Sequence, residues 1–144
     1  MLLSDLEILA RTIQCEAGSE GDITMKAIAC VIMNRINVDC GEYRRYRTIR
    51  DVVFGMGQLD SVKQYINGKY NPHNIFNMQP EQIHYDIAEW AMVGNKLSNF
   101  GSVLWFIRPL SSSCQLSYLS YVGKLVARIN NYCFYNPTIL FAET

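Results

Sequence analysis

Glu16 is the residue whose type and surroundings most directly suggest chemistry. It lies between Cys15 and Ala17, two residues before Gly18, at the end of a largely apolar stretch. Burial against apolar neighbours disfavours the charged form of a carboxyl group, so this position predicts an acid that stays protonated near neutral pH. The alternative is a surface glutamate that only ends a helix.

Glu20 is a second candidate carboxylate, four residues further along the chain. Two carboxylates that point into one cleft can act as general acid and general base in the cleavage of a glycosidic bond. Gly18 lies between Glu16 and Glu20 and argues against one continuous helix that would carry both on one face. Glu20 is otherwise a charge near the start of the next helix, where the helix dipole favours an acid.

Two amide side chains are candidates for binding a substrate. Asn34 follows an apolar helical run, so we expect it to be buried and to orient a neighbour such as Glu16. Gln58 follows Gly57 in a loop that glycine allows to approach a ligand closely. An amide there suits the N-acetyl and hydroxyl groups of sugars, although an ordinary turn has the same composition.

Four aromatic residues near the end of the chain could stack on sugar rings. They lie on or beside segments that we expect to form strands: Trp105, Phe106, Phe134 and Tyr135. Aromatic rings at this spacing also form hydrophobic cores, and the sequence alone leaves both roles open.

The elements that would position these residues are mostly helices. Ser4 and Glu7 match a capping box that starts the first helix, and Gly18 ends it. The apolar run 27–33 predicts a central, buried second helix. Capping and breaking residues predict helices near residues 5–17, 22–36, 48–54, 60–66 and 80–93.

A small antiparallel sheet is expected after residue 100. The short aromatic and β-branched segment 103–107 predicts one strand. Segments 124–129 and 132–135 flank Asn130 and Asn131, which can form a hairpin turn. The chain is therefore predicted to be a mainly α protein with a small antiparallel β element.

Length and charge restrict the class of protein. The 144 residues suit one domain, over residues 1–144, and 13 basic residues balance 13 acidic ones. We therefore expect no binding to nucleic acid or to a membrane surface. The local basic run of Arg44, Arg45, Arg47 and Arg50 is either a solvated loop or a contact to an anionic polymer.

The cysteines and the N-terminus bear on location. Five cysteines without repeated spacing are a poor disulfide framework, and this usage is typical of a reducing compartment. We expect no metal and no cofactor, since no cysteine or histidine cluster and no calcium loop is present. The first residues lack a basic, then apolar, signal peptide, and no apolar run is long enough for a membrane span.

Eight short stretches together resemble a known family. They are LAR at 9–11, CEA at 15–17, EG at 20–21, VIMNR at 31–35, TIRDVV at 48–53, GQ at 57–58, LWFIRP at 104–109 and CFYNPT at 133–138. Their order and residue types resemble cell wall hydrolases of the SleB and CwlJ type, the spore cortex-lytic enzymes. The short chain and its ending are more similar to the CwlJ branch, whereas Leu59 stands where many members carry Phe.

The resemblance implies a fold and an activity. It implies a fold like that of lysozyme and the lytic transglycosylases, with spore cortex peptidoglycan as substrate. The family's catalytic glutamate falls on Glu16, which would cleave the bond between N-acetylmuramic acid and N-acetylglucosamine as a lytic transglycosylase. Hydrolysis by water is the close alternative. A catalytically silent wall-binding protein and an amidase acting on peptide stems are the others.

The resemblance also implies a place of action. It places the protein in the spore coat and cortex region, made without a signal peptide in the mother-cell cytoplasm. A spore-coat protein is the expected partner besides peptidoglycan, and a response to calcium dipicolinate would come through such a partner.

Overall fold

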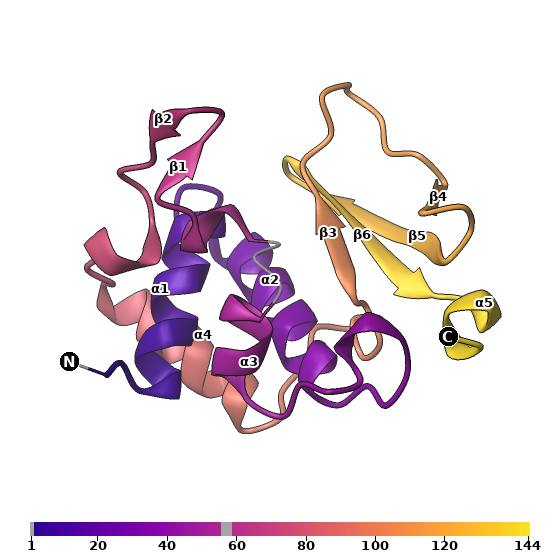
Figure 1. Ribbon diagram of the computed structural model, residues 1–144, viewed down its shortest axis with the longest axis horizontal. Helices are drawn as coiled ribbons and strands as arrows, with labels where there is room; N and C mark the ends of the chain where they lie inside the picture. The colour runs from indigo at the N-terminus through magenta and orange to yellow at the C-terminus, as the bar shows by residue number, and fades with distance from the viewer. Residues whose placement is uncertain (1, 56–58) are drawn as a thin grey trace.

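Helix α2 (Asp22–Ile36) lies at the centre of the helical half of the molecule (Figure 1). The structure is a computed structural model that describes residues 2–55 and 59–144. Every residue of α2 from 27 to 32 is buried, because α1 (Asp5–Ala17), α3 (Ile49–Phe54) and α4 (Gln82–Met92) pack around it. The predicted central helix is therefore confirmed.

Side chains at the helix starts explain why these helices begin where they do. The Ser4 hydroxyl accepts a hydrogen bond from the backbone N–H of Glu7 at 3.1 Å. Thr48 and Asp51 form a complete capping box at the start of α3. The predicted box at Ser4 forms only in half, because the Glu7 carboxylate binds Arg11 and the Tyr85 hydroxyl, each at 2.8 Å.

The predicted helix at 60–66 is wrong. A short 3-10 helix, η2 (Asp60–Val62), is followed by a hairpin of β1 (Tyr65–Ile66) and β2 (Lys69–Tyr70). Asn67 and Gly68 have positive φ angles of 52° and 80° and reverse the chain between these strands. Two further 3-10 helices are η1 (Gly41–Tyr43) and η3 (Ile75–Asn77).

A four-stranded antiparallel sheet lies beside the helices (Figure 1). Its strands are β3 (Trp105–Ile107), β4 (Ser117–Tyr118), β5 (Gly123–Ile129) and β6 (Tyr132–Pro137), in the order β3-β6-β5-β4. Asn130, with φ of 50°, makes the turn between β5 and β6. Helix α5 (Ile139–Ala142) follows the sheet. The predicted combination of helices and a small antiparallel sheet is confirmed.

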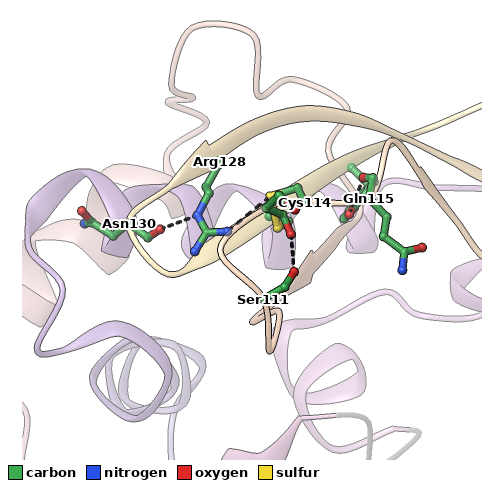
Figure 2. The surroundings of a disulfide bond; sticks show 8 residues. Ser111, Cys114, Gln115, Arg128 and Asn130 are labelled. Carbon is green, nitrogen blue, oxygen red and sulfur yellow. Dashed lines mark hydrogen bonds between the residues drawn. A yellow bond between two sulfur atoms is a disulfide. The ribbon is translucent and has the colours of Figure 1, made fainter.

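The prediction from the cysteine pattern is wrong in one respect, because Cys114 and Cys133 form a disulfide bond with Cα atoms 5.8 Å apart. Figure 2 shows the Arg128 guanidinium between the Asn130 carbonyl oxygen, at 3.0 Å, and Cys114 Sγ, at 4.0 Å. The bond ties the loop between β3 and β4 to strand β6. Since disulfides are rare in reducing compartments, cysteine usage no longer argues for one.

In the described part of the chain, no helix combines the length and the apolar character that crossing a membrane requires.

Candidate active site

Glu16 lies in the last turn of α1, where the helix meets the sheet. Its Oε1 atom is buried and has no hydrogen-bond partner among residues 2–55 and 59–144. The backbone N–H and the hydroxyl of Ser61 lie close enough to the Glu16 carboxyl group to lower its pKa. Burial without a strong hydrogen-bond partner disfavours the charged form of this carboxyl group.

A hollow of about 430 Å³ opens beside this carboxyl group, and we refer to it as the Glu16 cleft. Its described lining comes from both halves of the molecule: Glu16, Arg35, Leu59, Asp60, Trp105, Phe106, Arg108, Tyr118 and Tyr132. The cleft thus lies between the helical half and the sheet. It combines acids, cations and aromatic rings, so both polar and ring contacts to a ligand are available there.

The surroundings of Glu16 raise its pKa. Burial is the largest cause, because it disfavours the charged carboxylate. The backbone N–H of Ser61 opposes this and lowers the pKa, whereas the negative charge of Asp60 raises it further. The net direction is upward, as the position of Glu16 in the sequence predicted.

Hydrogen bonds from the sheet fix the backbone at Glu16. The Tyr132 hydroxyl donates to the Glu16 carbonyl oxygen at 2.6 Å and accepts from Arg108 Nη2 at 3.3 Å. The Arg108 guanidinium also lies over the Tyr132 ring, 4.8 Å from its centre. A helix and a strand that are 116 residues apart in the sequence therefore share one fixed contact at the cleft.

Two roles were left open for Glu20, a second carboxylate of the cleft and a charge near the next helix, and the structure does not support the first. Its carboxylate pairs with Arg108 at 2.5 Å and accepts the backbone N–H of Asn131 at 3.1 Å. Glu20 is not among the described residues that line the Glu16 cleft, whereas its partner Arg108 is. Asp60 is the second carboxylate of the cleft instead, on η2.

Asn34 is buried as predicted, but it does not orient Glu16. Its amide nitrogen donates to the carbonyl oxygens of Phe100 and Val103, each at 2.9 Å, and its oxygen accepts from Lys96 at 2.6 Å. It therefore ties the segment before β3 to helix α2. Asn34 lines a separate hollow that Lys96 and Leu104 also border.

The aromatic candidates divide into two groups. Trp105 and Phe106 line the Glu16 cleft, although Trp105 is almost fully buried and donates its indole N–H to Glu42 at 3.1 Å. Phe134 and Tyr135 lie outside that lining and in the hydrophobic core. Both belong to β6, an inner strand whose side chains are covered on both faces.

Gln58 lies outside the described residues, and its predicted contact to sugar stays a prediction.

Sequence reasoning did not select Arg35, Asp60, Arg108 or Tyr132 as site residues. They come from α2, η2, the end of β3 and β6, and only the fold brings them together. One sequence signal existed, since Arg35 is a cation in the turn that follows an almost entirely apolar helical run.

No group of three or more His, Cys, Asp or Glu side chains in the described ranges is arranged to hold a metal ion.

Comparisons with known proteins bear on this site. The profile of a family described as Cell Wall Hydrolase matches residues 19–135. A protein named cell wall hydrolase CwlJ from Bacillus subtilis (strain 168) is 27% identical, over 98% of this chain and 89% of that protein. Proteins of the same name from Halalkalibacterium halodurans and Oceanobacillus iheyensis are each 25% identical, over 93% and 94% of this chain and 86% and 88% of theirs. No solved structure matches significantly.

Proposed function

The chain belongs to the Cell Wall Hydrolase family, and we propose that it cleaves the glycan strands of spore cortex peptidoglycan with Glu16 as the proton-transferring residue. The observation that carries the proposal is the Glu16 carboxyl group, which lines a cleft with one oxygen buried and its pKa raised. A general acid must be protonated and must reach the oxygen of the leaving group. The names of the CwlJ relatives support the bacterial wall as the substrate.

The first step is proton donation. Glu16 gives its proton to the oxygen of the β-1,4 bond between N-acetylmuramic acid and N-acetylglucosamine. The bond from the muramoyl C1 to that oxygen breaks, and C1 takes on oxocarbenium character. The Asp60 carboxylate in the same cleft supports this step, because a negative charge nearby favours the developing positive charge.

The second step closes a ring. The muramoyl C6 hydroxyl attacks C1, and the Glu16 carboxylate takes the hydroxyl proton, which gives a 1,6-anhydro product and restores the acid. One carboxylate performs both proton transfers, as a lytic transglycosylase requires.

We also propose a fold related to that of lysozyme for this domain. The acid at the end of α1, beside the buried helix α2, supports it.

Hydrolysis is the second candidate, and Asp60 favours it. Two carboxylates flanking the bond can activate a water molecule that attacks C1, which leaves a reducing end. Asp60 lines the Glu16 cleft from η2 and is in a position to be that second group. In both cases we propose a location in the spore coat and cortex region, with a coat protein as partner.

Digestion of decoated spores by wild type and Glu16→Gln tests the proposal. General acid–base catalysis contributes roughly 100-fold to 10,000-fold, so Glu16→Gln should lose activity to about that extent. Glu89→Gln, an exposed carboxylate on α4, is the matched control and should retain full activity.

Mass spectrometry of the released fragments distinguishes the alternatives. Anhydro ends support the transglycosylase and reducing ends support hydrolysis. Intact glycan with freed peptide stems would identify an amidase. A Glu16→Gln variant as fast as wild type would remove Glu16 from the mechanism, and a wild type that binds the wall without cleaving it would indicate a silent wall-binding protein.

A further inference from the structure

A second hollow, of about 700 Å³, adjoins the Glu16 cleft, and we refer to it as the arginine hollow. Its described lining comes from η1 and the loop after it, from the sheet and from α5. Trp105 lines both hollows, so they meet at this side chain. A ligand in the Glu16 cleft therefore has a further surface beside it, which the proposed mechanism does not use.

The basic run after η1 divides into two pairs of arginines. Arg47 and Arg50 bind within the chain, since Arg47 Nη1 donates to the Arg44 carbonyl oxygen at 2.6 Å and Arg50 donates to that of Leu3. Arg44 and Arg45 line the arginine hollow instead. Of the four, these two are therefore the candidates for contact with an anionic ligand there.

The guanidinium groups of Arg44 and Arg45 are exposed and largely unpaired. Arg44 Nη1 makes one long bond, of 3.4 Å, to the Thr144 oxygen. No hydrogen bond or ion pair joins the Arg45 side chain to another residue of 2–55 and 59–144. Glu42 is the one acidic side chain in the described lining, and it accepts the Trp105 indole N–H at 3.1 Å. Two cationic side chains against one acidic one favour an anionic ligand.

The loop that carries these arginines is held against α5. Gly41 has a φ angle of 67°, and a Cβ atom there would lie 2.3 Å from the Phe141 ring, so glycine allows this close approach. Tyr43 is buried, and its carbonyl oxygen accepts the backbone N–H of Tyr46 at 3.0 Å. Phe141 in turn packs edge-to-face on Trp105, with ring centres 5.1 Å apart. A fixed backbone lowers the cost of ordering the site when a ligand binds.

We propose that Arg44 and Arg45 bind the free carboxylates of the peptide stem on a muramoyl residue held in the Glu16 cleft. This inference rests on the proposed function and names a further part of the substrate. The lactyl carboxyl group is neutral because it forms the amide to the stem, but the γ-linked glutamate and the diamino acid of the stem keep free carboxylates. Arginine matches a carboxylate in both charge and geometry. The apolar rings of Trp105 and Phe141 suit the methyl and methylene groups of the same stem.

The stem is long enough to reach the arginine hollow from the sugar. Three extended residues span about 10 Å. The two hollows meet at Trp105, so the stem has to pass only one side chain to leave the Glu16 cleft and enter the other hollow. The contact lets the protein distinguish a muramoyl residue with a stem from one without.

Binding to a chain that does not turn over tests this contact separately from catalysis. In the Glu16→Gln background, three disaccharides of N-acetylglucosamine and N-acetylmuramic acid are titrated and followed by NMR. The first carries the stem L-alanyl-γ-D-glutamyl-diaminopimelate, the second carries this stem with its carboxylates amidated, and the third carries a neutral methylamide in place of the stem. With both arginines present, the first should bind most tightly.

The double variant Arg44→Gln with Arg45→Gln removes both charges. It should weaken binding of the charged stem about tenfold, since two exposed ion pairs together contribute that much. Binding of the two neutral ligands should stay within about twofold, because they form no ion pair. If the double variant does not fold, Arg45→Gln alone should still weaken the charged stem selectively, because no contact of this side chain within the described residues is lost.

Lys124→Gln is the matched control. Lys124 is an exposed cation on β5 that lines neither the Glu16 cleft nor the arginine hollow. Its replacement removes one positive charge from the protein and should leave all three affinities unchanged.

Three results would overturn the inference: unchanged affinity for the charged stem in the double variant, equal weakening of all three ligands, and no preference for the charged stem before the arginines are changed. Unchanged affinity would leave the hollow to another anion, such as an acidic segment of a partner protein. Cleavage by the wild type is a separate measurement. If the wild type does not cleave the glycan but binding of the stem still depends on Arg44 and Arg45, the proposed function fails while this inference holds.

Discussion

The Tyr132 hydroxyl donates a 2.6 Å hydrogen bond to the carbonyl oxygen of Glu16. This bond joins the end of α1 to strand β6 and fixes the backbone that carries the candidate acid. The same hydroxyl accepts from Arg108, which is paired with Glu20. The position of one carboxyl group thus depends on a chain of contacts from the sheet.

Tyr132→Phe removes that hydroxyl and keeps the ring. We expect unfolding to cost about 1 kcal/mol less, the typical contribution of one hydrogen bond, and activity on cortex fragments to fall several-fold. Chemical denaturation and initial rates measure the two effects. Tyr85→Phe, which loses a hydroxyl bonded to Glu7 away from the cleft, should lower stability without lowering activity. Full activity in Tyr132→Phe would mean that the bond does not position Glu16.

The activity should depend on pH through Glu16. Burial is the largest cause that raises the pKa of this carboxyl group. The negative charge of Asp60 is the second cause that raises it. An acid must be protonated to donate, so the rate should be high at low pH and fall as pH rises through the raised pKa. Asp60→Asn removes a negative charge that raises the pKa of Glu16. The decrease in rate should therefore occur at lower pH in this variant. Initial rates over the pH range test this. If the decrease in rate moves to higher pH or does not move, the assignment of Glu16 as the titrating acid is contradicted.

Glu16 should also destabilise the fold at alkaline pH. Its pKa is higher in the folded than in the unfolded chain, so its stability contribution is complete below the unfolded pKa and is lost as pH rises through the folded one. The Glu16→Gln variant has no carboxyl group at this position, so it does not lose stability in this way as pH rises. It should therefore be more stable than wild type above that pKa, and the difference should shrink in acid. Thermal unfolding at acid and alkaline pH measures it, and a difference that grows in acid has the wrong sign.

Local sequence features predicted most of the fold. Apolar runs and caps such as Thr48 with Asp51 act within a few residues, and the helices they indicate are present. The segment 60–66 was misassigned because its conformation is set by the positive φ angles at Asn67 and Gly68 just beyond it.

The site could be predicted only in part. The neighbours of Glu16 in the sequence indicate its role. In contrast, Glu20 binds Arg108, and Asn34 binds carbonyl oxygens in the segment before β3. These partners are distant in the chain. Asp60 and Tyr132 line the cleft only because the fold brings η2 and β6 beside the end of α1. Contacts between residues that lie far apart in the chain leave no periodic pattern in one sequence.

The disulfide between Cys114 and Cys133 should stabilise the sheet half. It joins residues 19 positions apart, and closing a loop of that length in the unfolded chain contributes about 3 kcal/mol. Cys114→Ser should therefore unfold at lower denaturant concentration than the oxidised wild type, and reduction of the wild type should reproduce the effect.

The loop that the disulfide restrains leads from Arg108 to Tyr118, both of which line the Glu16 cleft, so activity on cortex fragments should fall along with stability. Cys40→Ser, a change at a free cysteine, is the control and should respond to a reductant as the wild type does. If Cys114→Ser and the oxidised wild type unfold at the same denaturant concentration, the bond does not form in solution and the loop is held by other contacts.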